Sequence, residues 1–393
     1  MAGEKANLKN KLLIISGSFP PDSGGPASLL PNLIPALMKN GYEVTVLTYG
    51  EQADDLPYRV VRISRRQIKP LVIIKLVWAA LKLAKSSGQI YSLDVYWPGF
   101  AAMIASKLLR KKQIARFTGD SAWETAANRG WTDKNLLDFQ KDYINFKIAL
   151  LKKLRTAILL NCRYVITDSH FLRGALVSFG VREDKILAVH NSVEYLPDPA
   201  DFSKEKFKRD NGLKEKVIIT VSRLVPWKGV GPVMNVLPRL KEYCRGISFV
   251  CIGNGPEFNK LKKQGDKLAA EHGLDIRLLG NIPRRLVIPW FLAADAYVLN
   301  TNYEGIAHTL VEALHFKTPI VASKAGGNGE IIISGFNGLM VDYSNEGQIF
   351  LALKRILTDE ELIKKLKNNS GEKLKNDFIW EKVVAVNLKA LAA

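Results

Sequence analysis

The sequence predicts two doubly wound α/β domains, each a parallel sheet with helices on both faces. Short apolar segments rich in β-branched residues alternate with longer amphipathic segments along most of the chain, as expected for repeated strand–helix units. A polar stretch rich in Pro, Asp and Lys interrupts this alternation at residues 197–216. The length of 393 residues also suits two domains. We therefore expect domains over 1–200 and 214–375, followed by a helix over 376–393 that docks back toward the first domain.

The elements of the first half follow from their residue patterns. The segment "EVTVLTY" alternates and is rich in β-branched residues, which predicts a strand, and Gly41 before it has the place of a helix C-cap. The strands expected in this half are 11–17, 43–49, 91–97, 113–119 and 164–169. The helices expected with them are 29–40, 99–109 and 170–180.

The alternation restarts after the polar stretch. The strands expected in the second half are 217–223, 247–253, 275–280, 296–301, 318–323 and 337–342. Doubly wound sheets bind ligands beyond the carboxyl ends of their strands. Two such domains that face one another would form a deep cleft between them. We therefore expect the chemistry in the loops that follow strands.

Charge and cysteine content narrow the class of protein. The formal net charge is +19 and the sequence pI is about 9.7, which favours an anionic partner such as nucleic acid, an acidic membrane surface or a phosphorylated substrate. The 3 cysteines show neither a disulfide framework nor zinc-site spacing. The N-terminal residues lack the apolar core of a signal peptide, and no apolar run reaches the ~18 residues of a transmembrane helix. We expect a cytoplasmic protein.

Two strand-end loops carry groups suited to an anionic ligand. Gly24 and Gly25 follow the first strand, where backbone N–H groups can approach an anion at the start of a helix. Arg223 and Lys228 follow the first strand of the second half, and two cations in such a loop can neutralise a diphosphate. The alternatives are an ordinary glycine turn and two surface cations of a very basic chain, and the sequence leaves both open.

Two carboxylates follow a later strand of the second half. In "EGIAHTLVEAL", Glu304 directly follows the strand and Glu312 lies a little over two helical turns further on. The two side chains can therefore converge on one site, although the outer face of a helix is the alternative. Gly326 and Gly327 follow the next strand and permit a backbone cradle for a phosphate or a sugar.

A nicotinamide cofactor is not favoured. Gly253 and Gly255 follow a strand and resemble a fragment of a dinucleotide fingerprint, but no G-x-G-x-x-G opens the first strand–helix unit of either half.

Taken in order, these motifs resemble the retaining, nucleotide-sugar-dependent glycosyltransferases of family four, which have the GT-B fold of two Rossmann-like domains. The resemblance rests on "FPPDSGG", "LMKNGYEVTVLT", "TDSHFLRGALVSFGVREDKILAVHNSVE", "VSRLVPWKG", "IGNGPE", "EGIAHTLVEAL" and "AGGNGEI". Most of these motifs are weak singly, but their shared order and spacing over most of the chain make the resemblance specific.

The resemblance implies roles for the matching residues. Arg223 and Lys228 match the cations that bind the donor diphosphate, Glu312 matches the carboxylate that binds the nucleotide ribose, and Glu304 matches the carboxylate near the donor sugar. The other donor-binding positions are Gly24, Gly25, Gly253, Gly305, Ile306, Ala325, Gly326 and Gly327. Family members use the nucleotide diphosphate sugar as co-substrate and need no cofactor or divalent metal. The absence of a D-x-D motif agrees with this.

The acceptor side departs from the family pattern. Where many members carry a histidine after a strand, this chain reads "FTGDSAWE", which makes Asp120 the catalytic candidate on the acceptor side. The alternative is an aspartate that caps the next helix. His308 lies near Glu304, and we expect it to be a packed or solvated residue of the loop.

Two basic segments of the first half predict a surface for an anionic membrane. The segments "RVVRISRRQIKPLVIIKLVWAALKLAK" and "NFKIALLKKLRTAILL" interleave cations with large apolar side chains, which is typical of interfacial helices. We expect a glycan or lipid-linked acceptor and peripheral binding at the inner face of a membrane, in cell-envelope or surface polysaccharide synthesis. An equally open alternative is a pair of core helices with solvated lysines.

Two other functions remain as alternatives. A GT-B epimerase or phosphorylase would use the same strand-end loops. A basic nucleic-acid-binding protein would account for the charge, but no nucleic-acid motif is present and the strand-end loops would be unexplained. We therefore expect no nucleic-acid partner.

Overall fold

The computed structural model describes residues 10–22, 25–52, 55–192 and 201–392. The chain divides into two compact units. The first unit consists of Met1–Ala126, Leu136–Val189 and Trp380–Ala393, and the second consists of Ala127–Asn135 and His190–Ile379.

The first unit contains a parallel sheet of 7 strands in the order β3-β2-β1-β4-β5-β6-β7. Its strands are β1 (Lys11–Ile15), β2 (Glu43–Tyr49), β3 (Arg59–Ile63), β4 (Gln89–Ser92), β5 (Lys112–Phe117), β6 (Tyr164–Thr167) and β7 (Ile186–Ala188). The helices along this part of the chain are α2 (Gly25–Lys39), α3 (Lys69–Lys85), α4 (Trp97–Leu109), α5 (Ser121–Asn128), α6 (Leu136–Phe139), α7 (Phe146–Asn161), α8 (His170–Ser178), the 3-10 turn η1 (Glu183–Lys185) and α18 (Trp380–Ala392).

Helices cover both faces of this sheet, and the apolar side chains of its strands alternate between the two faces. Leu12 and Ile14 of β1 join the apolar core with α2 and α18. Leu13 and Ile15 join a separate core with α3 and α4. Successive side chains of a strand point to opposite faces, so the apolar run of β1 is buried on both sides. The doubly wound prediction is confirmed for this unit.

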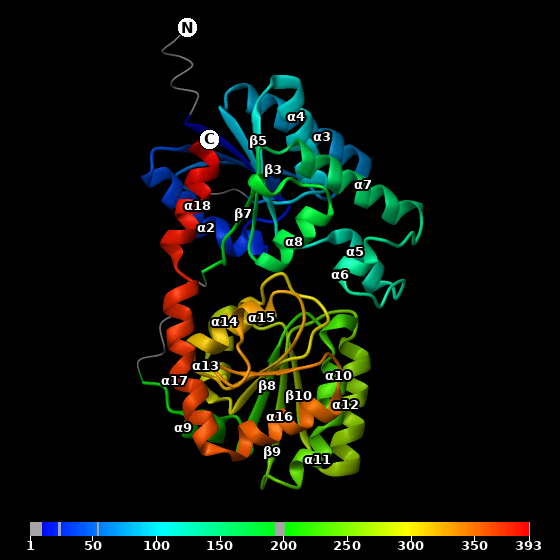
Figure 1. Cartoon of the computed structure of the whole chain (residues 1–393), viewed down its shortest axis with the longest axis vertical. Coiled ribbons are helices and arrows are strands. Elements are labelled where there is room, and N and C mark those ends of the chain that lie inside the picture. Colours follow the sequence, from blue (N-terminus) through cyan, green and yellow to red (C-terminus); the bar gives the residue numbers. More distant parts are fainter. Residues whose placement is uncertain (1–9, 23–24, 53–54, 193–200, 393) are drawn as a thin grey trace. The chain divides into compact units, whose positions relative to one another are not determined.

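The helix at the C-terminal end of the chain packs within the first unit. Figure 1 shows α18, in red, beside α2, in blue. Val383 and Leu391 of α18 are buried in the core shared with α2. The buried Tyr91 hydroxyl donates to Asn387 Oδ1 at 2.8 Å. This hydrogen bond joins the last helix to the central strand β4.

Several elements of the first unit differ from the prediction. Strands β3 and β7 were not predicted, and β3 lies within a segment expected to be an amphipathic basic surface. Helix α2 begins at Gly25 rather than at 29, because Pro26 fits the first turn of a helix, where its missing N–H needs no partner. Strand β4 ends at Ser92, since Asp94 Oδ1 accepts from Tyr96 N at 2.6 Å and turns the chain.

The second unit contains a parallel sheet of 6 strands in the order β10-β9-β8-β11-β12-β13. Its strands are β8 (Lys216–Val221), β9 (Ile247–Ile252), β10 (Asp275–Gly280), β11 (Ala296–Leu299), β12 (Ile320–Ser323) and β13 (Leu339–Val341), at the places predicted. Its helices are α9 (Lys204–Asp210), the 3-10 turn η2 (Pro226–Lys228), α10 (Val230–Asn235), α11 (Leu237–Lys241), α12 (Phe258–His272), α13 (Arg284–Ala293), α14 (His308–His315), α15 (Asn328–Ile331), α16 (Glu346–Thr358) and α17 (Glu360–Asp377). The strand order reverses between β8 and β11, and such a switch point is where doubly wound sheets bind ligands.

Much of the polar stretch expected to connect the domains belongs to the second unit. Helix α9 lies inside it, and Phe207 packs edge-on against Trp290 with ring centroids 5.1 Å apart. Lys204 and Lys208 bind the Asp295 carboxylate at 2.8 and 2.7 Å. Burial opposes ionisation of Asp295, but the two lysines outweigh it and lower its pKa. Residues 197–200 of this stretch lie outside the described residues.

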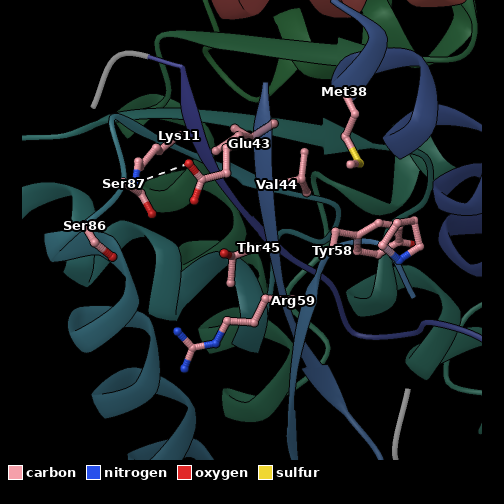
Figure 2. Close-up of a pocket in the computed structure, with 11 residues that line it drawn as sticks. Lys11, Met38, Glu43, Val44, Thr45, Tyr58, Arg59, Ser86 and Ser87 are labelled. Atoms are coloured by element: carbon pink, nitrogen blue, oxygen red, sulfur yellow. Dashed lines mark ion pairs between the residues drawn. The ribbon is translucent and has the colours of Figure 1, made fainter. Parts of the chain in front are cut away.

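A pocket of about 440 Å³ opens in the first unit (Figure 2). It is lined by Lys11, Leu12, Met38, Glu43, Val44, Thr45, Pro57, Tyr58, Arg59, Ser86 and Ser87. Figure 2 shows the ion pair between Lys11 and Glu43, which measures 3.2 Å. Because Lys11, Glu43 and Arg59 begin their strands, the pocket lies at the amino ends of the sheet. Ligand-binding loops of doubly wound folds lie at the opposite ends.

Among the described ranges, no helix combines the length and the apolar character needed to span a bilayer.

Candidate active site at the strand ends of the second unit

Four loops at the carboxyl ends of neighbouring strands of the second unit are joined by main-chain hydrogen bonds. These loops follow β9, β8, β11 and β12, and we refer to them together as the strand-end loops. The bonds that join them run from Leu224 N to Asn254 O (2.9 Å), from Asn302 N to Trp227 O (2.8 Å) and from Gly327 N to Glu304 O (3.0 Å). The loops therefore form one continuous surface across the switch point between β8 and β11.

Two glycines allow these loops to approach so closely. Gly253 has a φ of +133°, and a Cβ there would lie 1.9 Å from Ser222 O. Gly326 has a φ of +53°, and a Cβ there would lie 2.0 Å from Glu304 O. No other residue type can occupy these positions without moving the backbone. The N–H of Gly253 donates to Gly280 O at 2.8 Å, so this glycine supports the loop packing.

The switch point holds a largely buried ion pair between Lys228 and Glu304. Lys228 ends η2 after β8, and Glu304 lies in the loop after β11. Their side chains are only 10% and 15% exposed. Within the part of the chain that the structure describes, Lys228 is the sole hydrogen-bond partner of the Glu304 carboxylate. One carboxylate oxygen therefore remains for a ligand. Arg223 lies in the same loop as Lys228 and is exposed.

The main-chain N–H groups of the three residues just before α14, which starts at His308, are a second feature of this surface. Gly305, Ile306 and Ala307 are buried, yet their N–H groups have no acceptor among the described residues. Buried N–H groups normally have partners, and unpaired N–H groups at a helix N-terminus bind anions. The loop after β11 thus places free donors beside Glu304.

Glu312 lies further along α14 and has a different partner. Its Oε1 accepts from Arg284 Nη2 at 2.8 Å, and its side chain is 12% exposed. Burial raises the pKa of the Glu312 carboxyl, and the charge and hydrogen bond of Arg284 oppose that rise. The two glutamates of "EGIAHTLVEAL" therefore do not pair with one another. Each is bound to its own cation.

The remaining donor-binding candidates divide between the two units. Ala325, Gly326 and Gly327 lie in the loop after β12, in contact with Glu304 through the Gly327 N–H. Gly25 is the first residue of α2, in the first unit. Gly24 lies outside the described residues.

The structure places Asp120 in the interior of the first unit rather than at a surface. Its side chain is fully buried and forms an ion pair with Arg155. The Tyr96 hydroxyl donates to Asp120 Oδ1 at 2.5 Å, Ala122 N donates to the same oxygen at 2.9 Å, and Gln140 Nε2 donates to Oδ2 at 3.2 Å. Burial and the Asp120 charge raise the pKa of Tyr96, so its phenol remains a neutral donor. These contacts match the helix-capping alternative, because α5 starts at the next residue.

Two residues of interest were missed by the sequence analysis. No local sequence pattern marked Arg284 as a site residue, because its partner Glu312 lies 28 residues away. Asp94 was included in a predicted strand, although an acid three residues before Trp97-Pro98 was an available sign of a strand end. Asp94 follows β4 beside β1, where the order of the first sheet reverses. Burial raises the pKa of the Asp94 carboxyl to about 6, although hydrogen bonds from the Tyr96 and Gly99 backbone act to lower it.

Two family models match the chain. The model described as "Glycosyltransferase Family 4" matches residues 23–195, and the model described as "Glycosyl transferases group 1" matches residues 201–373.

Two relatives match the chain over most of its length. An uncharacterized glycosyltransferase of Methanocaldococcus jannaschii is 25% identical and covers 97% of this chain and 98% of the relative. The GDP-mannose-dependent alpha-(1-6)-phosphatidylinositol monomannoside mannosyltransferase of Mycolicibacterium smegmatis is 24% identical and covers 88% and 89%.

Solved structures share the same fold. HepE of Anabaena in complex with UDP has a TM-score of 0.75 at 18% identity and covers 97% of this chain and 99% of HepE. WaaG, a glycosyltransferase involved in lipopolysaccharide biosynthesis, has a TM-score of 0.71 at 14% identity and covers 96% and 99%.

Proposed function

The chain belongs to the family-four glycosyltransferases, and on that premise we propose that it is a retaining enzyme that moves a sugar from a nucleotide diphosphate sugar to a glycan or lipid-linked acceptor. In this reaction the bond between the anomeric carbon and the diphosphate breaks, and a bond from that carbon to an acceptor oxygen forms. The nucleoside diphosphate leaves. No cofactor or divalent metal takes part in the proposed transfer.

The observation that carries this proposal is the Lys228–Glu304 pair beside free N–H donors at the switch point of the second sheet. A departing diphosphate needs cations and preorganised donors. Lys228, Arg223 and the N–H groups at the start of α14 supply them. A carboxylate on the sugar side favours positive character at the anomeric carbon, which is the role we propose for Glu304.

We propose that the donor is a nucleoside diphosphate sugar. HepE binds UDP and UDP-glucose, and the mycobacterial relative is GDP-mannose-dependent. These ligands support a nucleoside diphosphate at the strand-end loops of the present chain. We propose that Glu312 accepts hydrogen bonds from the ribose hydroxyls, and that Glu304 lies near the sugar. The acceptor hydroxyl proton passes to the leaving phosphate in a front-face transfer.

Replacing Glu312 with alanine is expected to weaken binding of the nucleoside diphosphate about 10- to 100-fold, because hydrogen bonds to a charged group contribute about 1.5–3 kcal/mol each. Titration calorimetry with UDP, GDP and ADP measures this effect. Glu271→Ala is the matched control, since Glu271 is exposed on α12 and pairs only loosely with Lys267 at 3.8 Å. If no nucleoside diphosphate binds the wild-type protein, or if Glu312→Ala binds as tightly as Glu271→Ala, the donor site is wrongly assigned.

We also propose that the first unit binds an anionic membrane surface on the cytoplasmic side, where a lipid-linked acceptor of envelope or polysaccharide synthesis would be found. Helices α3 and α7 both pack against α4. On α3, Ile74 and Trp78 are 63% and 65% exposed, and on α7 Phe146 and Leu150 are exposed as well. Lysines flank these side chains on both helices. Large exposed apolar side chains among cations are the composition of an interfacial surface.

The cations of the predicted basic segment do not all belong to this surface. Arg65 forms a bidentate pair with Asp22, at 2.7 and 3.2 Å, and Arg62 donates to Pro20 O at 2.7 Å. These two arginines hold the loop after β1. The charge available to a membrane therefore comes from lysines on the helices, including Lys75 and Lys82.

The double variant Ile74→Ser/Trp78→Ser is expected to lose most of its co-sedimentation with vesicles that contain phosphatidylglycerol. The loss is expected because Ile74 and Trp78 would insert into the membrane at the surface where the neighbouring lysines meet the anionic headgroups. Vesicle binding should also weaken as the salt concentration rises. Leu351→Ser is the control, because Leu351 is similarly exposed but lies on α16 of the second unit. Absence of wild-type binding at low salt, or equal binding by the double variant, would argue against a membrane surface here.

A further inference from the structure

Arg284 and Glu312 form the second cation–carboxylate pair of the second unit's strand-end region. Arg284 begins α13, directly after the loop that follows β10. Its Nη2 donates to Glu312 Oε1 at 2.8 Å. Among the described residues, Arg284 is the sole side-chain partner of Glu312, so Oε2 has no protein donor. The pair thus leaves one carboxylate oxygen unoccupied on a side chain that is otherwise buried.

We propose that Arg284 is a positioning residue that keeps the Glu312 carboxylate ionised and leaves its second oxygen for the ribose hydroxyls of the donor nucleotide. This inference rests on the proposed function, in which Glu312 binds the ribose. Arg284 acts through Glu312 and need not touch the nucleotide.

The physical need for such a residue comes from burial. A carboxylate taken out of water favours its neutral form. A protonated carboxyl can offer a ribose diol one acceptor oxygen fewer than a carboxylate can. The guanidinium opposes protonation by its charge and by its hydrogen bond. Arg284 therefore maintains the form of Glu312 that accepts hydrogen bonds from two hydroxyls.

The other groups around Glu312 do not replace this cation. Tyr297 of β11 is buried, and its hydroxyl donates to Thr309 Oγ1 at 2.6 Å. Burial, together with the charges of Glu304 and Glu312, raises the pKa of Tyr297, so it stays neutral. Glu330 of α15 binds His190 at 2.9 Å. Helix α17 packs along α14 but, in the described ranges, supplies no ion pair to Glu312.

The sign of the pH effect follows from these contacts. Removing the cation raises the pKa of Glu312 further, so the variant protonates at a higher pH than the wild type. Donor binding by the variant is then lost earlier as the pH falls. Once both proteins are below their pKa, the variant therefore keeps a smaller ionised fraction of Glu312 than the wild type at the same pH. Both proteins bind the same nucleotide, so protonation of its diphosphate changes both dissociation constants by the same factor. That factor cancels in the ratio of the two constants.

The test measures dissociation constants of UDP, GDP and ADP for wild type, Arg284→Gln, Arg284→Lys, Glu312→Gln and Arg284→Gln/Glu312→Gln, from about pH 8 to about pH 5. Thermal unfolding of each variant checks the fold. We expect the ratio of the Arg284→Gln dissociation constant to that of the wild type to rise several-fold toward low pH, while Arg284→Lys stays near wild type. In the Glu312→Gln background, Arg284→Gln should add no further loss.

A ratio that is constant with pH, or a full additional loss in the double variant, would mean that Arg284 binds the nucleotide directly, and would overturn the inference. In that case weakened binding by Glu312→Gln would still support the ribose assignment. Wild-type binding by Glu312→Gln, or no binding of any of the three nucleotides, would instead overturn the proposed donor site and this inference with it.

Discussion

Replacing Lys228 with methionine is expected to lower kcat about 10²- to 10³-fold, the range seen when one preorganised donor to a developing negative charge is removed. Lys228 is nearly buried, and it follows β8 at the switch point where the diphosphate should leave. Methionine keeps most of the volume of the lysine stem and removes only the charge. The measurement is steady-state turnover with the nucleotide sugar that binds.

Controls for this prediction must separate chemistry from folding, because Lys228→Met also leaves the Glu304 carboxylate without its partner. The double variant Lys228→Met/Glu304→Gln removes that buried charge and should recover thermal stability without recovering turnover. Lys267→Met, at an exposed position on α12, should behave as wild type in both assays. Turnover by Lys228→Met within about threefold of wild type would contradict the assigned role, since that is far below the loss expected for such a donor.

Replacing Arg155 with methionine is expected to destabilise the first unit by about 3–5 kcal/mol, because it leaves the Asp120 charge buried without a cation. Both side chains are almost inaccessible to water, at 4% and 0% exposure. The Arg155 guanidinium also lies 3.6 Å from the centroid of the Phe179 ring. For a unit of this size the melting transition should fall by on the order of 10 °C. Differential scanning calorimetry of the whole chain measures it.

The double-mutant cycle with Asp120→Asn identifies the cause of that loss. If the ion pair is responsible, Arg155→Met should cost much less in the Asp120→Asn background, where no buried carboxylate remains. Arg182→Met is the surface control, because Arg182 pairs with Asp184 where both are exposed, and such pairs contribute little. An Arg155→Met transition unchanged from wild type would show that Asp120 is not held as the structure indicates. It would reopen an acceptor role for that residue.

Sequence pattern was sufficient for most of the fold. The strands of the second half were predicted at their places, because strands buried on both faces appear as continuous apolar runs between turn residues. Strand β3 was missed because its arginines, including Arg62, made the segment resemble a basic surface. In the structure Arg62 turns to main-chain oxygens of Tyr49 and Pro20. A side chain satisfied by distant backbone cannot be recognised from local composition.

In the candidate site, too, local pattern predicted where residues lie along the chain but not which partners surround them. The position of Glu304 and Lys228 in strand-end loops follows from the strand–helix alternation alone. Asp120 became an acceptor-side candidate because the resemblance places "FTGDSAWE" where many family members carry a histidine. The sequence did not indicate that the side chains around Asp120 would be those of Arg155, Tyr96 and Gln140. A polar residue after a strand can face a ligand or cap the next helix, and only the surrounding packing distinguishes the two.

By itself, the sequence determined the doubly wound class of both units, the loops that follow the strands and the residue types in them. These properties depend on periodicity and on short-range order along the chain. The tertiary structure alone decided the partners: Lys228 with Glu304 across 76 residues, Arg284 with Glu312 across 28, and Arg155 with Asp120 across 35. Pairings of this kind depend on strand order and register, because those decide which loops become neighbours. The pattern of a single strand or helix carries no record of that order.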